Sequence, residues 1–149
     1  MTELAVDIDH IGVSVSDMDR AIRFFRDGLG GTVTEPHLYD DPKIGAIVGI
    51  PGLRNIICQA FVGGKYFELL QYVEPVGSQA RNHRPCDPGH LHIALKVQDI
   101  EATIARLREH GFEPANPVQR NVGGSGLAAC YCYGFDGLVV ELIEYPKAG

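Results

Sequence analysis

The sequence lacks any apolar run long enough to cross a membrane, and it lacks clusters of basic residues. The chain has 149 residues, and none of its apolar stretches reaches the roughly 18 residues that a membrane helix needs. Its N-terminus is acidic, whereas a secretory signal begins with basic residues. With 13 Lys and Arg against 19 Asp and Glu, the net charge is −6, and no basic stripe is available for phosphate groups. We therefore expect a cytoplasmic protein with no nucleic-acid or membrane partner.

Cysteine is scarce as well, and the four that occur form no Cys-x-x-Cys pair. Closely paired cysteines are typical of zinc sites, and disulfide frameworks are typical of small secreted domains. Neither class is expected here, because 45% hydrophobic residues suffice for an ordinary core. The length fits one domain over residues 1–149. We expect free thiols at Cys58, Cys86, Cys130 and Cys132.

An internal repeat is visible when His10 is aligned with His92. The segment HIGVSVSDMD at 10–19 then matches HIALKVQDIE at 92–101 in its histidine, its apolar positions and one aspartate. A repeat of this kind indicates a duplicated structural unit.

The two halves also end alike, on ELLQY at 68–72 and ELIEY at 141–145. The first half is nine residues longer between the matched histidine and glutamate, which indicates an insertion. The single domain is therefore predicted to consist of two modules and a linker. The modules are expected at approximately 5–73 and 90–146, with the linker at 74–89.

Both halves predict the same order of elements: a strand, a helix and three further strands. Alternating apolar residues open each half, as at Ile11 and Val13, which is typical of a half-buried strand. Asp17 and Asp99 follow as predicted N-cap residues of helices. Later β-rich runs are expected at 32–34, 46–50, 54–62 and 65–72 in the first half and at 113–117, 128–133 and 138–145 in the second.

The same alternation predicts four polar side chains on the uncovered face of the strands. Residues two apart in a strand share a face, so Glu68 and Glu141 point away from their apolar neighbours. His10 and His92 lie on the corresponding face of the first strand of each half. Two imidazoles and two carboxylates around one point form a ligand set for a divalent metal. This set suits Ni, Co, Mn, Fe or Zn, and it disfavours a purely hard-ion or thiolate site.

Other residues of the predicted strands are candidates for lining a substrate pocket. Gly12 and Ala94, beside the two histidines, are small enough to leave room above the strands for a ligand. The pocket candidates are Asn55, Gln59, Tyr66, Tyr72, Tyr131 and Tyr133.

These residues resemble the vicinal oxygen chelate superfamily, which includes glyoxalase, bleomycin resistance and extradiol dioxygenase proteins. The resemblance runs from DHIGV at 9–13, through GHLHIAL at 89–95, to DGLVVEL at 136–142. It implies an α+β fold in which two repeated βαβββ modules form a cupped mixed sheet around a metal site. The implied metal ligands are His10, Glu68, His92 and Glu141. The metal would chelate two neighbouring oxygens of a small-molecule substrate. A homodimer is also implied, with the modules paired either within one chain or across two.

Two branches of the superfamily are most similar to the chain. Glyoxalase I has the same His/Glu/His/Glu set, but its glutathione-binding Arg and Asn correspond here to Ser14 and Tyr72. Methylmalonyl-CoA epimerase is similar around both histidine segments, although it normally has Gln where Glu68 stands. The resemblance favours an isomerase, epimerase or lyase that moves a proton through an enolate-like intermediate. Its general base would be Glu68 or Glu141.

Two alternatives stay open at this point. In a single-pair extradiol dioxygenase, His10, His92 and Glu141 would hold Fe(II), and Glu68 would be a bystander. The other alternative is a binding protein that sequesters an antibiotic or another small molecule without turnover.

Overall fold

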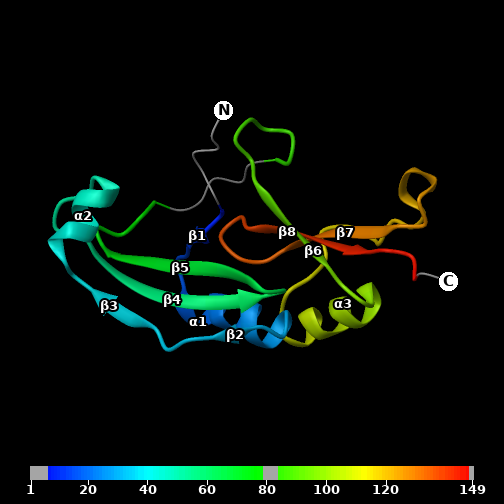
Figure 1. The fold of residues 1–149 in the computed structure, drawn as a ribbon, viewed down its shortest axis with the longest axis horizontal. Helices are drawn as coiled ribbons and strands as arrows, with labels where there is room; N and C mark the ends of the chain where they lie inside the picture. Colours follow the sequence, from blue (N-terminus) through cyan, green and yellow to red (C-terminus); the bar gives the residue numbers. More distant parts are fainter. Residues whose placement is uncertain (1–6, 79–83, 148–149) are drawn as a thin grey trace.

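The computed structural model describes residues 7–78 and 84–147, which form a mixed α+β fold with two sheets and three α-helices (Figure 1). This is the fold class expected from the sequence. The first sheet contains β1 (Ile11–Ser14), β2 (Thr32–Val33), β3 (His37–Tyr39), β4 (Arg54–Val62) and β5 (Lys65–Glu74). The second contains β6 (His92–Lys96), β7 (Ala128–Tyr133) and β8 (Val139–Glu144). The helical segments are α1 (Met18–Ile22), η1 (Arg23–Gly28), α2 (Pro42–Val48), α3 (Ile100–Glu109) and η2 (Val122–Gly124).

The two sheets repeat one arrangement of strands. In the first sheet β1 pairs with β5 in parallel, and β4 pairs with β5 antiparallel. In the second sheet β6 and β8 form the parallel pair, and β7 and β8 form the antiparallel pair. The strand orders are β1-β5-β4-β2, with β3 also paired to β4, and β6-β8-β7. The equivalent strands β1 and β6 therefore both lie at an edge of their sheet.

Each of these edge strands leads into a helix through a capping aspartate, as predicted. Asp17 and Asp99 each accept a hydrogen bond from the backbone N–H three residues further on, at 3.0 and 2.9 Å. Such caps satisfy N–H groups that have no partner within the helix. α1 continues directly into the π-helical segment η1, which packs against α3. Gly28 permits this contact, because a Cβ atom there would lie 2.8 Å from a methyl carbon of Leu107.

One apolar core joins the two halves of the chain. Phe24 on η1 is fully buried and makes edge-to-face contacts with Phe112 and Phe135, at ring-centroid distances of 4.8 and 5.7 Å. Both of these partners belong to the second half, and the same cluster contains apolar residues of both sheets. α1, η1 and α3 lie next to each other along one side of the molecule (Figure 1). Separating the halves would expose this core to water.

Polar contacts also connect the halves at the margin of the core. The side chain of Asp136 accepts hydrogen bonds from the N–H and the hydroxyl of Ser16, both at 2.6 Å. The Nε–H of Arg106 on α3 donates to the backbone carbonyl of Asp27 on η1. Together with the core, these bonds hold the two sheets in one relative orientation.

The prediction of a strand at 46–50 is wrong, because this segment forms the last turn of helix α2 and the turn that follows the helix. Asp41 caps the helix, and Pro42 occupies its first turn, where a missing N–H costs nothing. Gly49 ends the helix with φ 74°, a conformation that glycine adopts without strain. β3 and α2 have no counterpart between α3 and β7, so they account for the extra length of the first half.

The strand predicted at 113–117 is also absent from the sheets. Pro114 makes only an isolated bridge with Cys132. Pro114 and Pro117 have no backbone N–H for a ladder, so a continuous strand cannot form here.

The remaining expectations concern the linker and module bounds, the cysteines and membrane-spanning helices. Of the predicted linker at 74–89, residues 79–83 lie outside the described part of the chain, as do residues 5 and 6 of the first predicted module. All four cysteines are free; Cys86 is exposed and the other three are buried. No helix within the described ranges is long and apolar enough to cross a membrane.

Candidate metal and substrate site

The first pair of predicted ligands lies where β1 runs parallel to β5. Gly12 is the register partner of Glu68, so His10, two residues earlier, stands beside this carboxylate. The distance from His10 Nε2 to Glu68 Oε2 is 3.6 Å. The small Gly12 leaves the space above the strand open for these two side chains.

The second pair repeats this geometry where β6 runs parallel to β8. Ala94 is the register partner of Glu141, and His92 lies two residues before it. The distance from His92 Nε2 to Glu141 Oε2 is 3.3 Å. The internal repeat of the sequence therefore produces two equivalent His–Glu pairs.

Both glutamates face away from the core, as the alternation of the strands predicted. Phe67 and Leu69 flank Glu68 and are almost completely buried, as are Val140 and Leu142 around Glu141. The glutamate side chains themselves remain about one quarter exposed, at 25% and 24%. Both carboxyl groups are therefore accessible to solvent or a ligand on the open face of each sheet.

The donor atoms of each pair are spaced as two ligands of one cation are. Nitrogen and oxygen ligands at roughly 2.1 Å from a metal stand about 3.0 Å apart at a right angle and about 3.4 Å apart at a tetrahedral angle. The observed separations are 3.6 and 3.3 Å. Imidazole nitrogen with carboxylate oxygen suits first-row divalent ions. The residues present fit such an ion, and each pair would supply two of its ligands.

Asp9, which the sequence analysis did not single out, orients the first histidine. Its Oδ2 lies 2.6 Å from His10 Nδ1. An ionised carboxylate only accepts hydrogen bonds, so Nδ1 carries the proton and the Nε2 lone pair is left facing Glu68. This is the usual arrangement of a carboxylate behind a metal-binding histidine. The Asp-His dipeptide was the available signal, and Leu91 occupies the equivalent position in the second half.

A tyrosine accompanies each histidine. The Tyr66 ring centroid is 5.2 Å from that of His10, and the Tyr131 centroid is 5.3 Å from that of His92. The Tyr66 hydroxyl also donates to Glu68 Oε1 at 3.3 Å. Tyr131 is the register partner of Glu141 across β7 and β8. Both tyrosines thus contribute to the walls around the His–Glu pairs.

The pKa values of His10 and of the neighbouring Tyr66 are shifted from their ordinary values. The hydrogen bond that His10 donates to Asp9 raises the pKa of His10 above its ordinary value; desolvation opposes this, and the charges of Glu68 and Asp9 add to it. Burial raises the pKa of the Tyr66 hydroxyl, and the negative charge of Glu68 raises it further. Tyr66 therefore remains a neutral hydrogen-bond donor at neutral pH.

The two pairs do not meet within one chain. Across residues 7–78 and 84–147, no three His, Cys, Asp or Glu side chains gather closely enough to hold one metal ion. The ion-pair contacts of the predicted ligands run only within each half, from His10 to Asp9 and Glu68 and from His92 to Glu141. Within the described residues, the chain thus contains two separate His–Glu pairs.

Two predicted pocket residues lie on β4, the strand that pairs with the strand of Glu68. Gln59 is the register partner of Glu68, and both line a pocket of about 410 Å³ together with Thr34, His37 and Ile57. Asn55 lies four residues from Gln59 on the same strand face. Its side chain is 1% exposed, and neither amide atom has a hydrogen-bond partner among the described residues.

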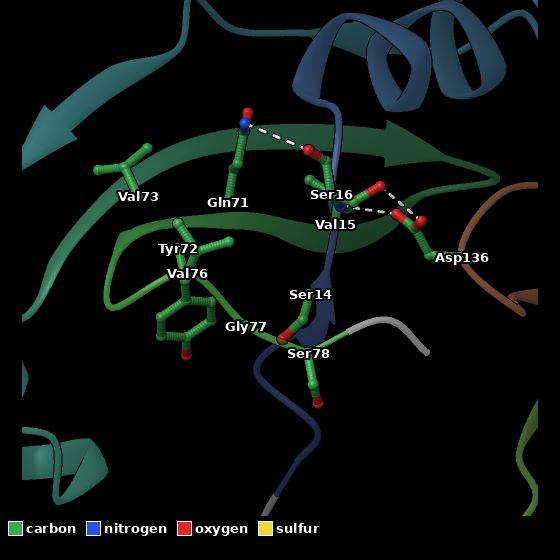
Figure 2. A pocket seen from close by; sticks show the side chains of 10 residues that line it. All are labelled: Ser14, Val15, Ser16, Gln71, Tyr72, Val73, Val76, Gly77, Ser78 and Asp136. Carbon is green, nitrogen blue, oxygen red and sulfur yellow. Dashed lines mark hydrogen bonds between the residues drawn. The ribbon is translucent and has the colours of Figure 1, made fainter. Parts of the chain in front are cut away.

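The other two predicted pocket residues line pockets that contain none of the four predicted ligands. Tyr133 is half exposed and lines a pocket of about 500 Å³ with Arg20 and Arg84. Tyr72 lines a larger pocket of about 700 Å³ at the end of β1 and β5. Figure 2 shows Tyr72 and Gln71 pointing to opposite sides of β5, with Gln71 on the side of the Ser16–Asp136 contact. This pocket contains none of the four predicted ligands.

Known proteins share this sequence pattern and architecture. The sequence matches the Glyoxalase/Bleomycin resistance protein/Dioxygenase superfamily over residues 7–142. The ethylmalonyl-CoA/methylmalonyl-CoA epimerase of Cereibacter sphaeroides is 26% identical over 141 residues, which cover 91% of this chain and 95% of that protein.

Solved structures show the same fold at low identity. A glyoxalase family protein from Bacillus cereus superposes with a TM-score of 0.85 at 21% identity, covering 97% of both chains. A mutant of the fosfomycin resistance protein FosX from Listeria monocytogenes, in complex with Mn(II) and 1S,2S-dihydroxypropylphosphonic acid, superposes with a TM-score of 0.62 at 18% identity. That alignment covers 93% of this chain and 90% of the FosX chain.

Proposed function

Because the chain belongs to the glyoxalase/bleomycin resistance protein/dioxygenase superfamily, we propose that it is a divalent-metal-dependent isomerase, epimerase or lyase. The proposed metal ligands are His10, Glu68, His92 and Glu141. The observation that carries the proposal is the pair of equivalent His–Glu contacts, at 3.6 and 3.3 Å, on the open faces of the two sheets. We propose a cytoplasmic homodimer that acts on a small molecule with two neighbouring oxygens.

The bound cation would act as a Lewis acid, lowering the pKa of a carbon-bound proton next to the coordinated substrate oxygens. The imidazoles of His10 and His92 would hold it through Nε2. Asp9 keeps the proton of His10 on Nδ1, so that Nε2 is free to bind. Of the cations that this donor set suits, namely Ni, Co, Mn, Fe and Zn, Mn(II) is tested first because the FosX complex contains it.

Glu68 is the proposed general base, with Glu141 as the second carboxylate that can exchange protons with the substrate. Oε1 of Glu68 accepts a hydrogen bond from Tyr66, while Oε2 faces His10. Glu68 also lines the pocket of about 410 Å³, so a substrate carbon in that pocket would lie within reach of its carboxylate. Glu68 would take a proton from this carbon and return it, and isomerisation or epimerisation follows if the proton returns to a different position or face.

The proposed substrates are α-oxo acids, α-hydroxy acids and acyl thioesters. The similarity to a CoA-ester epimerase supports the thioester class. Gln59 lines the pocket beside Glu68, and the buried Asn55 amide on the same strand face has both hydrogen-bonding atoms unsatisfied by described residues. The Gln59 amide N–H would donate a hydrogen bond to a carbonyl or carboxylate oxygen of the substrate.

The test begins with metal analysis of the purified protein, followed by reconstitution with Mn(II), Fe(II), Co(II), Ni(II) and Zn(II). Reconstituted protein is incubated in D₂O with α-oxo acids, α-hydroxy acids and acyl thioesters, and deuterium incorporation is followed by NMR. We expect metal-dependent exchange at the carbon next to the carbonyl. The Glu68→Gln variant should lose this exchange, and adding metal should not restore it. Gln71→Glu, a carboxamide–carboxylate exchange on the opposite face of β5, is the matched control and should retain activity.

Other outcomes assign the alternative functions. Fe(II)-dependent oxygen uptake with a catechol, abolished by His10→Ala but not by Glu68→Gln, would replace the isomerase with a dioxygenase. Small-molecule affinity that survives chelator treatment would instead support a binding protein without turnover. Protein that takes up no divalent ion and catalyses no exchange would overturn the proposal.

A further inference from the structure

A pocket at the end of the second sheet contains none of the four proposed metal ligands. The lining of this lysine pocket, which has a volume of about 690 Å³, includes Lys96 at the end of β6 and Tyr145 and Lys147 beyond β8. It repeats the pocket of about 700 Å³ at the end of β1 and β5, which Ser14 and Tyr72 line (Figure 2). Ser14 is the counterpart of Lys96 in the internal repeat, and each pocket includes the tyrosine that ends ELLQY or ELIEY. The duplicated fold thus produces a pocket at the same place in each half.

The two pockets differ in charge. The polar side chains of the first are hydroxyls, an amide and Asp136, whose carboxylate already accepts two hydrogen bonds. The second contains two of the four lysines of the chain. Asp99 also lines it, but its carboxylate accepts the N–H of Ala102 at 2.9 Å as the cap of α3. None of the ion pairs among the described residues involves either lysine of the pocket, so both ammonium groups are available to an anion.

Lys96 lies on the same face of the second sheet as the second His–Glu pair. Lys96 and His92 are four residues apart on β6, and side chains at every second position of a strand share a face. Tyr145 continues the same alternation four residues after Glu141. The Lys96 ammonium lies over the Tyr145 ring, 5.2 Å from its centroid. A cation–π contact of this kind positions the ammonium group without neutralising it.

The Lys96 side chain is directed away from His92. Its register partner is Ile143, whereas the ring beneath its ammonium group belongs to Tyr145, two residues further along the chain. Four residues of a strand span roughly 13 Å, so the Cα atoms of Lys96 and His92 are about this far apart, and the ammonium group lies beyond. A ligand that contacts both ends must therefore be extended. A small α-oxo or α-hydroxy acid is too short to do so.

We propose, resting on the proposed metal-dependent function, that Lys96 and Lys147 bind a phosphate group of an extended substrate and that Tyr145 positions Lys96 for this contact. Lysine ammonium groups commonly bind phosphate as point charges, and two cations in one pocket suit a doubly charged anion. Of the substrate classes proposed above, acyl thioesters fit, because a thiol carrier can bear phosphate far from the reacting carbon. The lysine pocket thereby selects acyl thioesters with a phosphorylated carrier over small acids.

The test measures binding directly, by ¹H–¹⁵N NMR titration of the full chain without added metal, so that it does not depend on turnover. ADP and acetyl-CoA are the probes that carry phosphate, and adenosine and S-acetylpantetheine are the matched probes without phosphate. We expect ADP and acetyl-CoA to shift the amide signals of residues 96–99, and the matched probes to leave these signals unchanged. The affinity for ADP should also fall as salt is added, because salt screens exposed charges.

Variants of the pocket test each role, and their spectra show that they are folded. Lys96→Gln should weaken ADP and acetyl-CoA binding roughly tenfold, the size of one lost contact to a charged group, and Lys96→Gln/Lys147→Gln should weaken it further. Lys96→Arg keeps the charge and should retain most of the affinity. Tyr145→Leu should weaken binding about two- to fivefold, as for a lost cation–π contact, whereas Tyr145→Phe should bind like the wild type. Lys65→Gln, at an exposed lysine that begins β5, is the matched control and should change nothing.

The contrary outcomes separate the phosphate pocket from the proposed function. Equal affinity of the wild type and Lys96→Gln/Lys147→Gln for ADP and acetyl-CoA, or no binding of either probe at millimolar concentration, overturns the phosphate pocket and leaves the metal-dependent reaction standing. Inorganic phosphate that binds as tightly as both probes reassigns the pocket to free phosphate and overturns the substrate class. Lysine-dependent binding in protein that takes up no divalent ion and catalyses no exchange supports the phosphate pocket and overturns the proposed function.

Discussion

The two His–Glu pairs of this chain have the same backbone frame but different surroundings. In both, the histidine stands at or just before the start of an edge strand, two residues before the glycine or alanine that pairs with the glutamate on the neighbouring parallel strand. Around His10 there is also a carboxylate, Asp9, behind the imidazole, whereas Leu91 holds the matching position before His92. The strand geometry is thus common to both halves, while the polar partners occur in the first half.

The aromatic neighbour differs between the halves in a related way. Tyr66 lies on the same strand as Glu68 and donates a hydrogen bond to it. In the second half, Val139 has the matching position, and Tyr131 comes from the neighbouring strand instead. The duplicated strand arrangement therefore keeps the same His–Glu spacing in both halves, while the residues around each pair differ. We propose that the first half adjusts proton transfer and that the second mainly holds the ion.

The largest expected effect comes from breaking the core that joins the halves. Phe24→Ala removes a fully buried ring that contacts Phe112 and Phe135. Loss of a buried Phe should lower the free energy of unfolding by about 3–5 kcal/mol, measured by urea denaturation. Leu38→Ala, at a half-exposed site, is the control and should change it by less than about 1 kcal/mol. Equal effects of the two substitutions would show that the halves are not joined through Phe24.

A smaller effect should distinguish the two histidines. Asp9→Asn removes the carboxylate that raises the pKa of His10, so this pKa should fall in the metal-free protein, as followed by NMR. Protons compete with metal for His10 below its pKa, so the acidic limit of metal binding should move to lower pH. At a pH well above the pKa of His10, Mn(II) affinity should drop roughly 10–100-fold, the usual loss when the hydrogen-bond partner of a metal-binding histidine is removed.

Asp7→Asn is the matched control for this prediction. It removes the same charge two residues earlier, where the carboxylate accepts a hydrogen bond from the N–H of Ile8. An equal loss of affinity in both variants would mean that net charge, and not the orientation of His10, is responsible.

The polar link between the halves should contribute less. Asp136→Asn keeps a residue that tolerates the positive φ of 50° but replaces the charge that accepts two bonds from Ser16. We expect a loss of about 1 kcal/mol in the free energy of unfolding, typical of a partly exposed hydrogen-bonded contact. Ser16→Ala, which removes only the hydroxyl bond, should cost less than Asp136→Asn; the reverse order would contradict the assignment.

The smallest effect should separate the two tyrosines. Tyr66→Phe removes the hydroxyl that donates to Glu68, worth about 0.5–1 kcal/mol, so the rate of deuterium exchange should change about two- to fivefold. Tyr131→Phe keeps the ring beside His92 and should leave this rate nearly unchanged. A larger effect of Tyr131→Phe would reverse the proposed division between the halves.

Local patterns in the sequence predicted much of the fold correctly. Alternation placed Glu68 and Glu141 on the face opposite the buried residues, and the capping role of both aspartates is confirmed. The prediction of a strand failed at 46–50. The apolar residues there have β-propensity, but they form the end of a helix that Asp41 caps and that begins at Pro42. A short apolar run does not by itself distinguish a strand from a helix.

The sequence by itself determined the duplicated plan, the identity of the two His–Glu pairs and the face on which each pair lies. These properties depend on the alternation of side chains along each strand and on the pairing of neighbouring strands. Both can be read from the sequence, because the repeat places matching residues in the two halves. Only the tertiary structure decided how the halves are oriented. The helices pack through a shared aromatic core, and among the described residues the two pairs stay apart and β1 and β6 lie at sheet edges. That orientation depends on the fit between buried surfaces that are distant in sequence. Local sequence patterns therefore do not predict it.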